Sequence, residues 1–174
     1  MRISDAIVPE LDHEAGNTRK TLERIPADKF TWKPHTKSMS MGQLAIHVAT
    51  IPEWVGAILG GDGMDFASPE VAGYKPPDLK TTKELLDRFD KTTADARAAI
   101  TAADDEHLMK PWTLRAGPQV FFTLPRIAVI RSMVMSHTIH HRAQLGVYLR
   151  LNEIPVPSVY GPSADETGMG ATAG

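Results

Sequence analysis

Two histidines four residues apart, His137 and His141, are the residues of this chain most suited to chemistry. At about 100° per residue, positions four apart in an α-helix differ by only roughly 40° and lie one turn apart, so their side chains converge. Two imidazoles on one helix face suit one metal ion. His140 offers a rival spacing of three from His137, but it is turned by roughly 100° from the face that carries His141. The expected pair is therefore His137 and His141.

The segment from Leu124 to Leu151 is predicted to be the helix that positions this pair. Pro125 falls in its first turn, where proline is tolerated. Residues that recur at alternating steps of three and four predict a face turned toward the core of a helical bundle. This stripe consists of Ile127, Ile130, Val134, His137, His141, Gln144, Tyr148 and Leu151. Both histidines thus occupy positions at which the pattern favours leucine or isoleucine.

A second predicted helix, from Ser40 to about Leu59, carries a third histidine of the same kind. Ser40 is a plausible N-cap with Gln43 as its capping-box partner, and a Gly-Gly pair follows the helix. Its apolar stripe is Leu44, His47, Ile51, Trp54 and Ile58. Pro52 should bend the helix one turn after His47. If the two stripes face each other, His47, His137 and His141 point to one place.

These three imidazoles predict a metal site with an open coordination position. Zinc bound by three protein ligands keeps one position for water or substrate, and histidine also suits nickel, iron, cobalt or copper. The ligand rings need hydrogen-bond partners on their other nitrogens, and helix phase makes Glu14, Thr18 and Gln144 the candidates. His13, His35 and His107 lie in less patterned surroundings and are expected to be ordinary solvated residues.

Composition narrows the remaining possibilities. The chain has 174 residues, a net charge of −2 and no cysteine. The length suits one domain, and the absence of a basic stripe or a long apolar run argues against nucleic-acid and membrane partners. Without cysteine there is no disulfide and no thiol nucleophile of the protein's own. No signal-like segment is seen at the N-terminus, so a cytoplasmic protein is expected.

The fold class expected is all-α, a single antiparallel-type bundle of four helices with long connections. The two further helices should run from about Ile3 to Arg24 and from Thr81 or Thr82 to about Asp104. Residues 62–80 carry too many glycines and prolines to form a regular element, and 120–123 could be a short extended piece. The domain should span residues 1–166, and the small-residue tail 167–174 is expected to be disordered.

Several motifs resemble those of the DinB/YfiT-like family. The resemblance covers most of the chain, from the first helix to about Glu166. It is carried by 42–47 (GQLAIH), 137–145 (HTIHHRAQL), 148–150 (YLR), 32–34 (WKP), 38–40 (SMS) and 160–165 (YGPSAD). Ala143 departs from the pattern, because the family commonly has glycine there.

That resemblance implies a four-helix bundle in down-up-up-down order, often a homodimer, with a divalent ion held by one histidine of the second helix and a pair on the fourth. Carried over, the ligands are His47, His137 and His141, and the ion is zinc, nickel or iron. Relatives with an assigned activity include thiol-dependent S-transferases and an isomerase. Here, an external thiol is compatible with the absence of cysteine.

The leading hypothesis is accordingly a metal-dependent enzyme that activates a low-molecular-weight thiol for S-transfer to a small electrophile. Arg142 is a candidate anion contact, or else a surface or interface salt bridge. Trp32 and Trp54 could line the pocket, although core packing is the commoner role of such residues. The alternatives are a metal-hydroxide hydrolase, a non-catalytic stress-related bundle that binds a metal or ligand, and a bundle with an empty histidine cluster.

Overall fold

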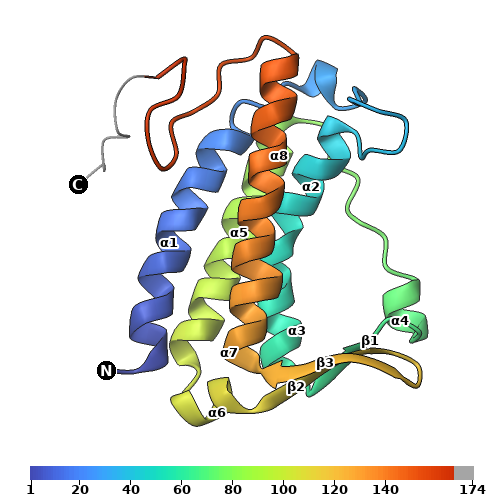
Figure 1. The fold of residues 1–174 in the computed structure, drawn as a ribbon, viewed down its shortest axis with the longest axis vertical. Helices are drawn as coiled ribbons and strands as arrows, with labels where there is room; N and C mark the ends of the chain where they lie inside the picture. The colour runs from blue at the N-terminus through green and yellow to red at the C-terminus, as the bar shows by residue number, and fades with distance from the viewer. Residues whose placement is uncertain (167–174) are drawn as a thin grey trace.

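The computed structural model describes residues 1–166, so the predicted tail 167–174 lies outside the described residues. Four long helical segments lie side by side (Figure 1). They are α1 (Ile3–Leu22), α2–α3 (Met41–Thr50 and Trp54–Gly60, joined by the 3₁₀ turn η2, Ile51–Glu53), α5 (Thr82–Ala102) and α7–α8 (Arg126–Val129 and His137–Leu151, joined by η3, Ile130–Ser136). The short helices are η1 (Ala27–Lys29), α4 (Pro69–Ala72) and α6 (Asp105–Met109).

Two of the long segments run one way and two the other. The ion pairs Arg19–Asp90 and Arg97–Asp12 join α1 to α5 in opposite order along the two helices, so these helices are antiparallel. In Figure 1, α1 and α7–α8 rise while α2–α3 and α5 descend. The long connection from α3 to α5 runs back along the bundle, which allows these two consecutive segments to point the same way. These directions are the ones implied by the resemblance.

The expectation of a strictly all-α protein is wrong, because a three-stranded sheet lies at one end of the helices (Figure 1). Strand β1 (Gly63–Asp65) pairs in parallel with β2 (Pro111–Ala116), and β2 pairs with β3 (Gln119–Pro125) as an antiparallel hairpin. The predicted extended piece 120–123 is part of β3. The prediction of no regular element in 62–80 is also wrong, since this stretch forms β1 and α4.

A glycine in β1 and the alternation of buried and polar residues in β2 explain how these strands form. A Cβ atom at position 63 would lie 2.4 Å from the Thr113 carbonyl oxygen, so only glycine permits this close parallel pairing. In β2, Trp112 and Leu114 alternate with polar neighbours, and both are buried against the helices. Gly117, with φ of 56°, forms the turn of the hairpin.

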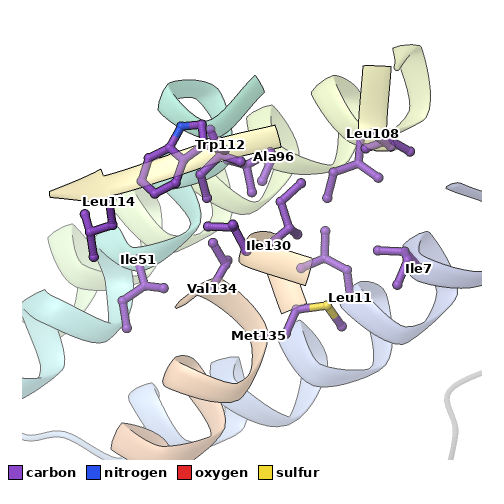
Figure 2. Close-up of a cluster of buried hydrophobic side chains, with 14 residues drawn as sticks. Ile7, Leu11, Ile51, Ala96, Leu108, Trp112, Leu114, Ile130, Val134 and Met135 are labelled. Carbon is purple, nitrogen blue, oxygen red and sulfur yellow. The ribbon is translucent and has the colours of Figure 1, made fainter. Parts of the chain in front are cut away.

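The buried side chains form two clusters, one toward each end of the bundle. The cluster at the sheet end combines Trp112 and Leu114 of β2 with helical residues such as Ile51, Ile130 and Val134 (Figure 2). The other cluster, called the upper core cluster below, lies at the end of the helices away from the sheet. It includes Leu22, Met41, Leu44, Phe89, Leu145 and Leu149. The segments that carry the three predicted histidines cross the boundary between the two clusters.

The fourth predicted helix contains a π-helical stretch, η3, that the sequence did not reveal. Its wider i→i+5 turns change the phase of the residues that follow. The buried face of α8 is therefore formed by Thr138, Arg142, Leu145 and Leu149. The predicted stripe is displaced to the edge of that face, where His137 and His141 are partly buried, and Leu151 is exposed.

No helix within residues 1–166 combines the length and the apolar character needed to cross a membrane.

Candidate metal site

The structure brings together the three histidines that the sequence singled out. His47 comes from α2, and His137 and His141 come from α8; one candidate ligand atom of each lies within 4.8 Å of the others. The Nε2 atom of His137 is 3.3 Å from Nε2 of His47 and 2.7 Å from Nε2 of His141. His140 is exposed and contributes to no such cluster among the described residues. Helix phase therefore predicted which two histidines of α8 lie together with His47.

Local features of α2 hold His47 in place. The capping box at the start of the helix is formed, because the Gln43 backbone N–H donates to Ser40 Oγ and the Ser40 N–H donates to Gln43 Oε1, at 3.1 and 2.9 Å. After Thr50 the α-helix gives way to the 3₁₀ turn that contains Pro52, as expected for a proline inside a helix. This change of geometry brings Trp54 onto the site.

The indole of Trp54 packs edge-on against two of the imidazoles. Its ring centroid lies 5.9 Å from that of His47 and 5.2 Å from that of His137. The hypothesis that Trp54 lines the site is thus supported by its position. Trp32 lies elsewhere, packed edge-on against Tyr148 beside the upper core cluster.

Hydrogen bonds orient the two rings of α8 with Nε2 toward the centre of the cluster. Nδ1 of His141 lies 2.7 Å from Oε1 of Gln144, so the predicted role of Gln144 fits the geometry. The ring of His137 bonds to the backbone carbonyl of Met133, one turn earlier. Because Nε2 of His137 faces the other rings, we assign this bond to Nδ1. With a proton on Nδ1, each ring has a lone pair on Nε2.

All three imidazoles are held in the neutral form. Burial, with a smaller contribution from the nearby His141 and His137, lowers the pKa of His47 to about 4. Burial is also the main cause of the lowered pKa of His137 and of His141. A desolvated site disfavours a charged imidazolium, so each of the three rings can present one nitrogen lone pair to a metal ion at neutral pH.

The donor set fits a divalent ion. Two facing lone pairs at 2.7 Å repel unless a cation lies between them, and burial makes protonation costly. In a tetrahedral zinc site with Zn–N bonds of 2.0–2.1 Å, ligand nitrogens are about 3.3 Å apart. The separation of 3.3 Å between His47 and His137 matches this spacing. The cluster can therefore hold a metal ion with small adjustments of the rings.

Glu14 and Thr18 do not serve the histidines, contrary to the prediction from helix phase. Both bind Arg142, whose Nη1 donates to Glu14 Oε2 at 2.7 Å and to Thr18 Oγ1 at 3.2 Å. Nη2 of Arg142 donates to the Tyr160 hydroxyl, which donates to Glu14 Oε2 at 2.7 Å. Arg142 is buried and its guanidinium pairs with Glu14 inside the chain, so it is not a surface salt bridge, and the anion contact gains no support from its position.

His107 is also not the solvated residue that the sequence suggested. It is partly buried, its Nε2 lies 2.9 Å from the Leu59 carbonyl oxygen, and Arg126 Nη1 lies beside its ring. His13 and His35 are exposed, as expected.

Two cavities adjoin the histidine cluster. One, of about 440 Å³, is lined by His47 together with Gln43, Ile46, Thr50, Tyr74 and Asp78. The other, of about 320 Å³, is lined by Trp54 and Met133 on the helical side and by residues of 64–74 and β2 on the other. Tyr74 borders both cavities. Sequence reasoning missed Tyr74, although the unusual length of the 62–80 connection indicated that it could cover part of the bundle.

These features define a class: mostly helical proteins with an interhelical three-histidine cluster that can hold a metal ion. The model of the DinB family matches residues 4–169, so the chain belongs to the DinB family. It is similar to the uncharacterized protein YrdA of Bacillus subtilis (strain 168), with 21% identity over 162 residues that cover 93% of this chain and 90% of YrdA.

Two solved structures are similar in fold. A DinB-like protein from Bacillus cereus aligns with a TM-score of 0.68 and 19% identity, covering 90% of this chain and 97% of that protein. The DinB-like protein YjoA from Bacillus subtilis aligns with a TM-score of 0.64 and 20% identity, covering 86% of this chain and 95% of YjoA. At these identities the likeness concerns the fold alone.

Proposed function

We propose that His47, His137 and His141 bind a divalent metal ion and that the protein is a metal-dependent enzyme. The observation that carries this proposal is that the Nε2 atoms of His137 and His141 face each other at 2.7 Å on α8, with a third imidazole next to them. With both α8 rings protonated on Nδ1, neither of these partly buried Nε2 atoms donates to the other, so the empty, neutral cluster costs free energy.

The composition of the cluster favours catalysis over a purely structural role. Among the described residues it contains no carboxylate and no thiolate, so the ligands leave the full charge of the ion in place. When bound, a divalent ion with an open position lowers the pKa of a thiol or a water molecule. Partial exposure of the three rings is consistent with access for such a group.

The residues of the chain would orient and shield the reacting molecules. Gln144 and the Met133 carbonyl hold the α8 rings with Nε2 forward, and the Trp54 indole keeps water from one side of them. We assign the thiol to the 440 Å³ cavity beside His47, because Gln43, Thr50 and Asp78 make its lining more polar than that of the other cavity. The protein has no cysteine, so the thiol must be a low-molecular-weight cosubstrate, and the second substrate a small electrophile.

The identity of the ion is tested first. Protein purified without a histidine tag should contain about one equivalent of zinc, nickel or iron by elemental analysis, and the His137→Ala variant should contain much less.

A panel of thiols is then assayed with a model electrophile such as 1-chloro-2,4-dinitrobenzene. Thiol-dependent turnover that is lost in His137→Ala and kept in His140→Ala supports the proposal. Turnover without any thiol would instead indicate hydrolysis. Tight metal retention with no turnover in either assay would indicate a metal-binding module.

Homodimer formation, implied by the family resemblance, stays a prediction that sedimentation velocity can test. The expected cytoplasmic location likewise stays a prediction.

A further inference from the structure

The second cavity beside the site differs in character from the one that contains His47. Its volume is about 320 Å³, and its lining is largely apolar. Half of its twelve lining residues are the apolar residues Trp54, Ile58, Val71, Leu114, Val129 and Met133, which come from four parts of the fold (α3, α4, β2 and α7–η3). We propose that this cavity binds an apolar, non-anionic part of the electrophilic substrate, aromatic or aliphatic. This inference rests on the proposed function, and it names the substrate class for the same site.

The cavity shares walls with the histidine cluster. The Trp54 indole that lines it also contacts the rings of His47 and His137, at centroid distances of 5.9 and 5.2 Å. Met133, which lines it too, accepts the hydrogen bond that orients His137. A molecule in the cavity would therefore lie against the same indole that packs on the imidazoles. This arrangement places an apolar group next to the reactive centre without occupying it.

The charges around the cavity oppose an anion. Glu53 and Glu70 are the charged side chains that border it, and no lysine or arginine of the described chain does so. The carboxylate of Glu53 is already paired with Arg88 at 2.6 Å. An anionic ligand would lose its hydration against an apolar wall and gain no cationic partner. An apolar ligand would instead gain by removing hydrocarbon surface from water.

The two cavities together give a layout for two substrates. The more polar cavity is lined by His47 and suits the thiol, and the apolar cavity suits the electrophile. Both cavities border Tyr74. Two different reactants can then approach the cluster from different sides, so neither has to be displaced before the other binds.

Binding of a matched pair of probes tests the inference. 2-Methylnaphthalene carries a methyl group where 2-naphthoate carries a carboxylate. Equilibrium dialysis measures the affinity of the protein for each probe. Chelator-treated, full-length protein is used, because a bound ion would attract the carboxylate. The Val71→Trp variant fills the cavity from α4. Val147→Trp is its matched control, because Val147 lies on the outer face of α8 and lines a separate apolar cavity of about 460 Å³.

We expect 2-methylnaphthalene to bind at least tenfold more tightly than 2-naphthoate. Val71→Trp should weaken its binding at least tenfold, and Val147→Trp less than twofold. Equal binding of the two probes, or weakening by Val147→Trp in place of Val71→Trp, would overturn the inference. Circular dichroism confirms that both variants are folded, and the smaller change Val71→Phe replaces Val71→Trp if it is not.

The same variants separate this inference from the proposed function. If the probe binds as expected but no thiol-dependent turnover is found, the cavity assignment stands and the proposed enzyme does not. If turnover is found but Val71→Trp leaves the KM for an aromatic electrophile unchanged, the enzyme stands and the cavity assignment is wrong.

Discussion

Helix α8 carries two polar clusters that begin at adjacent residues and behave in opposite ways. Arg142 turns toward α1, where Glu14, Thr18 and Tyr160 satisfy its guanidinium from several directions. His141 turns toward α2, where its Nε2 meets another acceptor of the same kind. The arginine cluster is closed, because Arg142, Glu14 and Thr18 are buried and paired with one another, whereas the histidine cluster is open and its three rings are partly exposed.

The comparison separates interior polar groups that the chain itself satisfies from those that it leaves open. Polar groups that leave water must find partners, and a cluster that finds all of them within the chain needs nothing further. The closed cluster also holds Tyr160, and with it part of the C-terminal segment, against α1 and α8. In the open cluster, His137 and His141 have orienting bonds on their outer nitrogens and none that suit their inner ones, which is the pattern expected of metal ligands.

The largest effect is expected from breaking the closed cluster. Glu14→Ala leaves the buried charge of Arg142 without its carboxylate, so the free energy of unfolding should fall by about 3–5 kcal/mol. Urea unfolding monitored by circular dichroism measures this change. Metal affinity of the folded fraction should stay the same, since Glu14 does not touch the histidines.

Glu10→Ala is the matched control on the same helix. Glu10 pairs with Arg131 at the surface, so its loss should cost less than about 1 kcal/mol. If Glu14→Ala cost no more than Glu10→Ala, or if it abolished metal binding in protein that remains folded, the division between a structural and a ligand-binding cluster would be wrong.

The next largest effect is expected from opening the histidine cluster further. His137 contacts both of the other rings, so His137→Ala should lower the affinity for zinc by at least about 100-fold. Its unfolding free energy without metal should change by less than about 1 kcal/mol, because the side chain is partly exposed. Competition with a chromophoric chelator measures the affinity. His140→Ala, which alters an exposed neighbour, should bind zinc as the native protein does.

The separation of the two clusters was only partly predictable from the sequence. The spacing of four between His137 and His141, and the place of His47 in a second stripe, predicted which rings would meet, because side-chain direction in a helix follows directly from residue number. Two helix starts followed from the sequence in the same way: Ser40 caps α2 as expected, and α5 begins at Thr82, one of the two predicted starts.

The predictions that were wrong depended on contacts between distant segments or on irregular helix geometry. Helix phase placed Glu14 and Thr18 on the inner face of α1 but could not show that Arg142 would reach them first. The π-helical turns of η3 moved the histidines to the edge of the buried face, and no residue type signals such turns reliably. Strand β1 was missed because it is three residues long and pairs with a partner about 50 residues away in the chain.

A smaller effect is expected from the residue that orients His141. Gln144→Leu removes the acceptor at 2.7 Å from His141 Nδ1 and keeps the side chain about the same size. Zinc affinity should fall by about tenfold, because a ligand ring without its outer hydrogen bond is less well oriented and less basic. Gln119→Leu, at the exposed start of β3, is the matched control and should bind zinc normally. An unchanged affinity in Gln144→Leu would show that this bond does not prepare the ring for a metal.

The smallest effect is expected from acid acting on the metal-free protein. Burial lowers the pKa of His47 to about 4, whereas an unfolded histidine has its ordinary pKa of 6.5. Between these values the unfolded chain binds more protons than the folded one, so the free energy of unfolding rises with pH and falls as the solution is acidified. From pH 6.5 to pH 5, where most carboxylates stay ionised, His47 should account for a loss of about 1 kcal/mol after allowance for its partial exposure. The pKa values of His137 and His141 are also lowered, so they add to the loss with the same sign. Urea midpoints across this range should therefore show a shallower slope for His47→Gln than for the native chain. Equal slopes for the two proteins would mean that a protonated imidazole is as stable in the histidine cluster as in water. The histidine cluster would then not be a site that disfavours charge, and its contrast with the arginine cluster would be wrong.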